Sequence, residues 1–202
     1  MKIGLVLECS KGGPDQKVLE PLVKKLVRPP IEVTSRTLGN KPKLLNGCGA
    51  VASELLKDRC DRVIVVWDLW PSWASDKPCR RKDRNEALAS LAEARVDQRK
   101  IRLLCIEQML ESWLLADARA LELLVAKWIE PRTPKNFRVP PGAAFDTKPK
   151  GLLRRLFRDH GCRPYEDIAH AHLIAVRWNN QSLQRLAQLP TFQRFLRCVL
   201  HQ

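Results

Sequence analysis

VIVVWDLW, Val63 to Trp70, is a run of β-branched and aromatic residues that contains a single acidic residue, Asp68. Such side chains are enriched in strands, and a short apolar run of this kind is typical of a buried strand. Charged residues precede the run and Pro71 follows it. The sequence therefore predicts a buried strand from Val63 to Trp67 that ends beside a carboxylate.

Strand and helix patterns alternate on both sides of this strand. Parallel strands need a crossover connection, and a helix is the usual one, so the alternation predicts an α/β fold with a mainly parallel four-stranded sheet flanked by helices. The other predicted strands are Ile3 to Leu7, Ile31 to Leu38 and Ile101 to Ile106. The predicted helices are Gln16 to Arg28, Leu44 to Arg59, Asp83 to about Arg95 and Glu107 to Lys127. Pro21 should bend the first helix or delay its start, and the second helix is expected despite Gly47 and Gly49. Asp83 and Glu86 form a capping box at the start of the third helix, and the fourth helix is expected to break near Asp117.

The chain of 202 residues is long enough for one α/β domain with an appended segment. Prolines are frequent between residues 129 and 149, where periodicity is weak, so this range is expected to be a Pro-rich loop. Residues 150–202 contain short helical patterns and are few for an independent fold. We therefore expect an α/β domain over residues 1–128 and a helical C-terminal extension over residues 150–202 that packs on it.

The net charge of +14 is concentrated in clusters of lysine and arginine. Such clusters attract polyanions, and nucleic acid is the commonest partner. A solvated basic surface, or one that binds an acidic protein, is the alternative interpretation. The clusters are Lys24, Lys25 and Arg28; Arg80, Arg81, Lys82 and Arg84; and Lys148, Lys150, Arg154, Arg155 and Arg158.

The seven cysteines are spread singly, without a C-x-x-C pair. This set is typical of reduced thiols in a cytosolic protein and fits neither a disulfide framework nor a zinc site. His170 and His172 are two apart on a predicted helix and point to opposite faces, so they do not predict a zinc site either. No segment has the length of a membrane span, and the protein is expected to be cytoplasmic.

Acidic residues follow the predicted strands. Glu8 comes after the first strand, Asp68 after the third and Glu107 after the fourth, and Glu111 lies one helical turn beyond Glu107, on the same face. Ligands of open parallel sheets bind beyond the carboxyl ends of the strands. Carboxylates that converge there favour a hard cation such as Mg²⁺ or Mn²⁺, which could polarise a phosphodiester or activate a water. In the alternative interpretation, Glu8 and Asp68 cap helices or pair with arginines.

Several segments resemble known families. LVLECSKGGPDQKVLEPLVKKL, VIVVWDLW, IEQMLESWLLAD and LPTFQRFL together resemble a small bacterial Toprim-like family with an E-x-W-L-L-A-D motif, here Glu111 to Asp117. Members of that family often neighbour an AAA-type ATPase in anti-phage operons. The wider Toprim fold occurs in topoisomerases, primases and nucleases of the overcoming-lysogenisation-defect type.

The resemblance implies roles for particular residues. Glu8 matches the Toprim glutamate, which binds metal and serves as general acid or base, Asp68 matches the first acid of D-x-D, and Glu111 is the helix acid. Two positions depart from the pattern: Cys9 replaces the usual glycine, and Trp70 replaces the second aspartate. Because an indole cannot bind a hard cation, Asp76, Glu107 or Glu111 would have to supply the missing oxygen.

The segment after Asp68 mixes tryptophans with basic residues. Trp67 is predicted to belong to the core, whereas Trp70 and Trp73 could stack on exposed bases while a loop carrying Arg80, Arg81, Lys82 and Arg84 holds phosphates. Tryptophan and arginine also favour protein interfaces, so a docking surface is the alternative.

Two hypotheses follow from the sequence. In the first, a Toprim-type metal-dependent nuclease acts on nucleic-acid phosphodiesters with an ATPase partner in anti-phage defence. In the second, the Toprim-like domain is degenerate and binds nucleic acid or the ATPase without catalysis. Tyr165 follows Arg163 and Pro164, outside the predicted sheet, which argues against topoisomerase chemistry.

Overall fold

The computed structural model describes residues 1–27, 29–70, 78–128 and 137–200. The chain forms two compact units, a sheet unit (Met1–Glu107 with Arg194–Gln202) and a helical unit (Gln108–Gln193). This division differs from the expected boundaries at residues 128 and 150. The segment after the fourth strand joins the helical unit because its apolar side chains, Trp113, Leu114 and Leu115, are buried among the helices of that unit.

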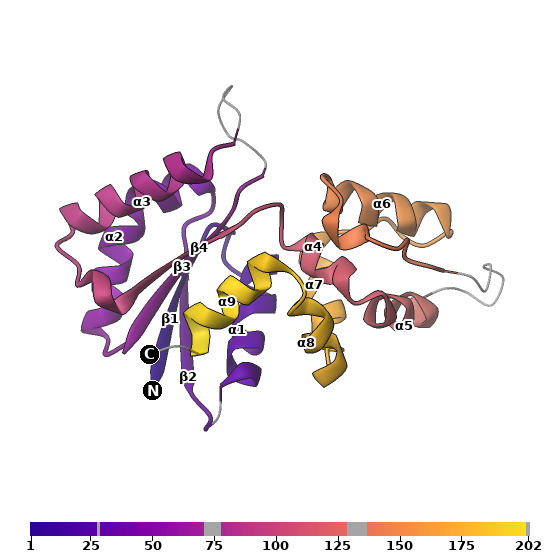
Figure 1. Ribbon diagram of the computed structural model, residues 1–202, viewed down its shortest axis with the longest axis horizontal. Helices are drawn as coiled ribbons and strands as arrows, with labels where there is room; N and C mark the ends of the chain where they lie inside the picture. The colour runs from indigo at the N-terminus through magenta and orange to yellow at the C-terminus, as the bar shows by residue number, and fades with distance from the viewer. Residues whose placement is uncertain (28, 71–77, 129–136, 201–202) are drawn as a thin grey trace. The chain divides into compact units, whose positions relative to one another are not determined.

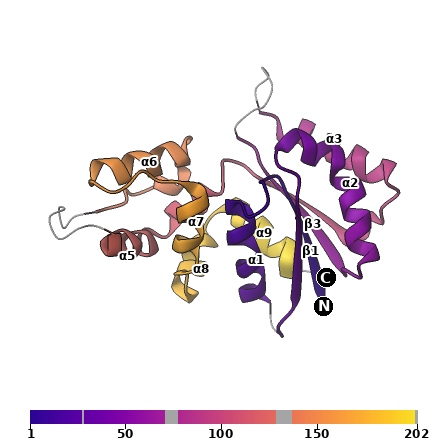
Figure 2. The ribbon, with the colours of Figure 1, turned by 180° about the vertical axis from the view of Figure 1, so that it is seen from behind.

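The sheet unit contains four parallel strands in the order β2-β1-β3-β4. Figures 1 and 2 show α2 and α3 on one face of the sheet, and α1 with residues 194–200 of α9 on the other. The predicted α/β class with a parallel four-stranded sheet flanked by helices is confirmed. The elements are β1 (Lys2–Leu7), α1 (Pro14–Leu26), β2 (Glu32–Thr37), α2 (Lys41–Lys57), β3 (Arg62–Asp68), α3 (Arg80–Glu93), the short 3-10 helix η1 (Gln98–Lys100), β4 (Ile101–Ile106) and α9 (Pro190–Leu200).

The VIVVW segment occupies the sheet interior as β3, between β1 and β4. Every residue of β3 is buried, and the side chains of Val63, Ile64 and Val65 are fully inaccessible. A strand covered by helices on both faces has no solvent-facing side, which is why its sequence lacks alternation. The prediction of a buried strand over Val63 to Trp67 is confirmed.

The strand order reverses between β1 and β3. From β1 the chain crosses to β2 at one edge, and it then returns past β1 to β3 and β4. The backbone register pairs Leu7, the last residue of β1, with Val66 of β3, so Glu8 leaves the sheet beside the last two residues of β3, Trp67 and Asp68. Ligands of open α/β sheets bind at such a reversal, beyond the carboxyl ends of the strands.

The four predicted helix starts are each wrong by a few residues, and two of them have a clear physical reason. Helix α1 begins at Pro14 rather than Gln16 and continues through Pro21. Pro14 suits the first turn because a backbone N–H at that position would have no partner within the helix. Helix α3 begins at Arg80, with Cys79 as its N-cap. The carboxylate of Asp83 does not cap the helix, because it instead accepts a hydrogen bond from the indole of Trp67.

Gly49 allows α2 and α3 to approach closely. A Cβ atom at this position would lie 2.0 Å from the carbonyl oxygen of Ser90. The backbone N–H of Gly49 donates to the hydroxyl of Ser90 at 3.0 Å, and that hydroxyl donates to the carbonyl of Asn46 at 2.8 Å. The glycine that weakens the helix pattern in the sequence is therefore required by the packing of the two helices.

The helical unit is built from short helices around aromatic side chains. Trp113, Phe157 and Phe192 are fully buried, and Trp113 meets Phe192 edge to face with ring centroids 5.0 Å apart. The predicted break at Asp117 is confirmed, because it separates α4 from α5. The elements are α4 (Glu111–Ala116), α5 (Ala118–Trp128), the 3-10 helix η2 (Ala143–Phe145), α6 (Pro149–Asp159), α7 (Asp167–Ala175), α8 (Asn180–Leu186) and the first residues of α9.

All seven cysteines are free thiols. Among the residues that the structure describes, no helix combines the length and the apolar character needed to span a bilayer.

Candidate functional site

Glu8 and Asp68 meet at the carboxyl ends of β1 and β3. Glu8 directly follows β1, and Asp68 is the last residue of β3. The Oε2 atom of Glu8 accepts a hydrogen bond from the backbone N–H of Asp68 at 3.1 Å, and Asp68 itself is buried. Two acidic residues that are sixty positions apart in the sequence are thus neighbours where the strand order reverses.

Glu8 is held in an unfavourable environment for a negative charge. Burial, followed by the negative charge of Asp15, raises the pKa of Glu8 to about 8, and Asp83 adds to this effect. The N–H of Asp68 and the ammonium of Lys41 oppose the rise without cancelling it. A positive charge that approached this carboxylate would be strongly favoured, because it would stabilise the ionised form.

Lys41 is a buried cation that the sequence did not predict. At the start of α2, its Nζ atom donates to the carbonyl oxygen of Leu69 at 2.6 Å and lies 3.6 Å from Oδ2 of Asp83. The same Oδ2 accepts from Nε1 of Trp67 at 3.2 Å. A lysine in a first helical turn is usually exposed, so its sequence context gives no signal that it is buried.

Cys9, which replaces the glycine expected after Glu8, is a protonated thiol. Burial, followed by the charge of Asp15, raises the pKa of Cys9 to about 12. A thiol with such a pKa is not a nucleophile or a metal ligand at neutral pH, because both roles need the thiolate. Cys9 therefore packs in the turn after β1, where its Cβ lies 2.8 Å from the position of a Cβ added to Gly13.

The donors at this edge suit a hard divalent cation only in part. Glu8 and Asp68 supply carboxylate oxygens, and Mg²⁺ is commonly bound by one or two carboxylates together with waters and phosphate oxygens. Within the described residues, however, no group of three or more histidine, cysteine, aspartate or glutamate side chains is placed to hold a metal ion. Asp76, one of the predicted substitutes for the missing aspartate, lies outside the described residues. A cation here would thus rely on Glu8, Asp68 and ligands from water or substrate.

Glu107 lies between two arginines. Its Oε1 atom accepts hydrogen bonds from Nη1 of Arg80 at 2.7 Å and from Nη2 of Arg194 at 2.8 Å. Arg80 comes from the first turn of α3 and Arg194 from α9, so Glu107 joins two helices beside the end of β4. The prediction that Glu107 and Glu111 share a helix face is wrong, because α4 begins only at Glu111.

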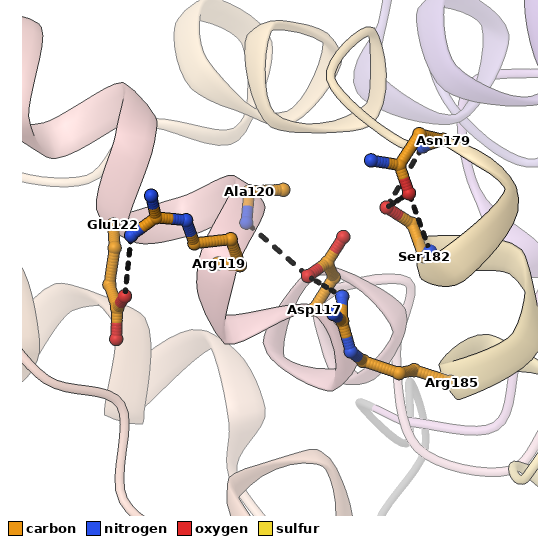
Figure 3. A network of polar contacts seen from close by, with 7 residues as sticks. All are labelled: Asp117, Arg119, Ala120, Glu122, Asn179, Ser182 and Arg185. Atoms are coloured by element: carbon orange, nitrogen blue, oxygen red, sulfur yellow. Dashed lines mark hydrogen bonds and ion pairs between the residues drawn. The ribbon is translucent and has the colours of Figure 1, made fainter.

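The E-x-W-L-L-A-D motif lies in the helical unit, where its polar side chains bind to other helices of that unit. Glu111 is buried, with one oxygen 3.9 Å from Nζ of Lys150. Trp113 donates from Nε1 to the hydroxyl of Thr191 at 3.0 Å. Asp117 accepts from Nη1 of Arg185 at 2.7 Å and from the N–H of Ala120 at 3.3 Å (Figure 3). These contacts give the motif a structural role in fixing α4 against α6, α8 and α9.

The predicted nucleic-acid residues lie on a helix rather than on a loop. Arg80, Arg81, Lys82 and Arg84 are exposed at the start of α3. Trp70 is 45% exposed beyond β3, whereas Trp67 is buried as predicted. Trp73 lies outside the described residues. The basic side chains and the Trp70 indole are thus available to a ligand.

His170 and Tyr165 have structural surroundings in the helical unit. The Nδ1 atom of buried His170 accepts from the N–H of Glu166 at 2.8 Å. The Tyr165 ring is buried and packs edge to face on Phe157. These contacts leave neither side chain exposed for chemistry on a large substrate.

Comparisons with known proteins do not identify a family for this chain. No protein-family model matches the chain, and no curated protein matches it. Among solved structures, the C-terminal region of the Burkholderia pseudomallei OLD protein is similar, with 13% sequence identity over 97% of this chain and 96% of that chain, and a TM-score of 0.45. At this level of similarity the likeness carries no argument about the site, which is described by its own residues.

Proposed function

We propose that this protein is a Toprim-like, metal-dependent nuclease that acts on nucleic-acid phosphodiesters. The observation that carries the proposal is the hydrogen-bonded pair of Glu8 and Asp68 at the reversal of strand order. Its surroundings add support, because the raised pKa of Glu8 indicates a carboxylate that a cation would stabilise.

In this proposal Glu8 and Asp68 hold Mg²⁺ or Mn²⁺. The ion, when bound, supplies positive charge to a phosphoryl oxygen. Without a bound cation, the pKa of Glu8 is raised to about 8, so this carboxyl group can hold or release a proton at physiological pH. Arg80 and Arg194, both held by Glu107, provide guanidinium groups for the phosphate backbone. Glu111, which resembles a family site residue, supports the helical unit through Lys150.

A second candidate function is favoured by one observation. The ammonium of Lys41 already lies 3.6 Å from the carboxylate of Asp83, beside the same strand ends. A built-in cation of this kind would stabilise the acidic edge without a metal, as expected for a degenerate Toprim-like domain that only binds nucleic acid or a partner protein. The resemblance stated above suggests an AAA-type ATPase as that partner and anti-phage defence as the setting. Copurification of the two proteins would test this part of the proposal.

Cleavage and metal binding can be measured on the same set of variants. We expect the purified protein to cleave single- or double-stranded DNA or RNA with Mg²⁺ or Mn²⁺, with the activity lost in Glu8→Gln and Asp68→Asn. The matched control is Glu93→Gln, an exposed glutamate at the end of α3, which should leave cleavage unchanged. Calorimetric titration with Mn²⁺ should give one site in the wild type and none in Asp68→Asn. Binding of nucleic acid without cleavage or Mn²⁺ uptake, with or without the ATPase, would support the second candidate instead.

A further inference from the structure

A surface pocket in the helical unit lies apart from the residues assigned above. It has a volume of about 490 Å³ and is formed by the segment from Pro140 to Asp146 and by one side of α6. Its floor is apolar, because Leu152 and Leu156 of α6 contribute nearly buried side chains. Its polar lining consists of Arg155, Asp146 and Asp159.

The rim of the pocket carries an exposed aromatic ring. Phe145 is 61% exposed although it lies in an ordered turn. Its N–H donates to the carbonyl of Gly142 at 2.9 Å, and Gly142 itself has a positive φ of 75°, a conformation that favours glycine. The turn therefore holds a large apolar side chain at the surface instead of in the core.

Arg155 of α6 lines the pocket, and Arg154 precedes it on the same helix. In the part of the chain that the structure describes, neither Arg154 nor Arg155 forms an ion pair, and both are exposed on α6. Neighbouring cations in the same unit do have partners: Lys150 binds Asp167 at 2.5 Å, and Arg158 binds Asp159 at 3.2 Å. Arg155 thus brings to the pocket of Phe145 an exposed guanidinium group that forms no ion pair within the described residues.

We propose that this pocket binds one nucleotide of a single-stranded nucleic acid, with the base stacked on Phe145 and a flanking phosphate on Arg155. An aromatic platform beside unpaired arginines is how single strands are held without sequence preference. The carboxylates of Asp146 and Asp159 suit the N–H and O–H donors of a base or a sugar, and they would repel an acidic peptide. The inference rests on the proposed function, which makes nucleic acid the ligand, and extends it by naming a single strand and a second contact region.

Fluorescence anisotropy with a labelled oligothymidylate of twenty nucleotides tests the proposal on the full chain, in EDTA to prevent cleavage. Phe145→Ala should weaken binding about tenfold, as expected for the loss of one stacked base, and Phe145→Trp should retain it. Arg155→Ala should weaken binding and lower the slope of log affinity against log salt by roughly 0.7, because one phosphate contact is lost. Arg163→Ala removes an exposed arginine of the same unit outside the pocket and serves as the matched control.

Further measurements separate the possible outcomes. An oligonucleotide without bases should bind wild type and Phe145→Ala equally, because it offers nothing to stack. The proposal is overturned if Phe145→Ala binds oligothymidylate as tightly as wild type, or if Arg155→Ala has the same affinity and salt dependence as Arg163→Ala. It is also overturned if poly-glutamate displaces the oligonucleotide and this displacement depends on Phe145 and Arg155. The variants alter exposed side chains, and circular dichroism verifies their folding. If the protein binds single strands through Phe145 but cleaves no nucleic acid, the proposed nuclease function is rejected and this inference stands. If the protein cleaves nucleic acid and the variants at Phe145 and Arg155 bind and cleave as the wild type does, the nuclease function stands and this inference is rejected.

Discussion

The carboxylate of Glu8 accepts a hydrogen bond from the backbone N–H of Asp68 at 3.1 Å. This contact joins the ends of β1 and β3, the two strands between which the order of the sheet reverses. The hydrogen bond stabilises the ionised form of Glu8, but burial and the charges of Asp15 and Asp83 outweigh it. The strand ends thus carry a carboxylate that is poised between its neutral and charged forms near physiological pH.

The raised pKa of Glu8 makes stability depend on pH. Without divalent cations, Glu8 holds a proton in the folded state up to about pH 8, whereas in the unfolded chain it loses the proton near its ordinary pKa of 4.5. Between these values the folded state binds more protons, so the free energy of unfolding should fall as pH rises through this window. Glu8→Gln keeps an acceptor for the Asp68 N–H and should be more stable than wild type at pH 8.5 by on the order of 2–4 kcal/mol.

Urea denaturation in EDTA at pH 5.5 and pH 8.5 measures this effect, with Glu93→Gln as the control. Equal pH slopes for wild type and Glu8→Gln would show that Glu8 ionises normally. Adding Mn²⁺ should stabilise the wild type at pH 8.5 and leave Glu8→Gln unchanged, because only the carboxylate gains from the cation.

Replacing Gly49 and Gly47 should have opposite effects. Gly49→Ala places a methyl group 2.0 Å from the Ser90 carbonyl and should destabilise the protein by about 2–4 kcal/mol, because α2 and α3 must separate. Gly47→Ala meets only Leu38 at 3.8 Å and should stabilise α2 by about 0.5–1 kcal/mol, since alanine favours the helix. Thermal or urea unfolding of the two variants checks the prediction, and a similar loss in both would contradict the close approach of the helices.

The buried carboxylate of Asp117 should be important for the helical unit. Asp117→Ala removes the partner of Arg185 and an acceptor for the N–H of Ala120, and it should lower the free energy of unfolding by about 2–3 kcal/mol. Arg119→Ala breaks a pair with Glu122 that is exposed and 3.9 Å long, so it should cost less than about 0.5 kcal/mol (Figure 3). Equal effects in chemical denaturation would argue against a structural role for the motif aspartate.

Removing the ammonium of Lys41 should strengthen cation binding at the strand ends. In Lys41→Met the negative charges of Glu8 and Asp83 lose a neighbouring positive charge, so affinity for Mn²⁺ should rise several-fold while stability without metal falls. Mn²⁺ titration followed by calorimetry measures the change, and Lys43→Met, at an exposed position of the same helix turn, is the control. An unchanged or weaker affinity would favour the second candidate function.

The sequence by itself determined the strands, the α/β class and the position of two acids. The apolar run through Val66 predicts a buried strand, and strands of a parallel sheet end at the same edge, so Glu8 and Asp68 could be placed at that edge from the chain alone. These inferences succeed because strand formation and side-chain periodicity depend on residues close in sequence.

Only the tertiary structure decided which side chains surround those acids. Lys41 and Asp83 lie in the first turns of helices and become neighbours of Glu8 because the strand order β2-β1-β3-β4 brings α2 and α3 to one face. Glu111 follows β4 closely in sequence, yet its helix is buried in the helical unit, where Lys150 lies nearby. The requirement for Gly49 likewise depends on a helix forty residues away. Contacts of this kind arise from packing between distant segments, and local sequence does not encode which segments will meet.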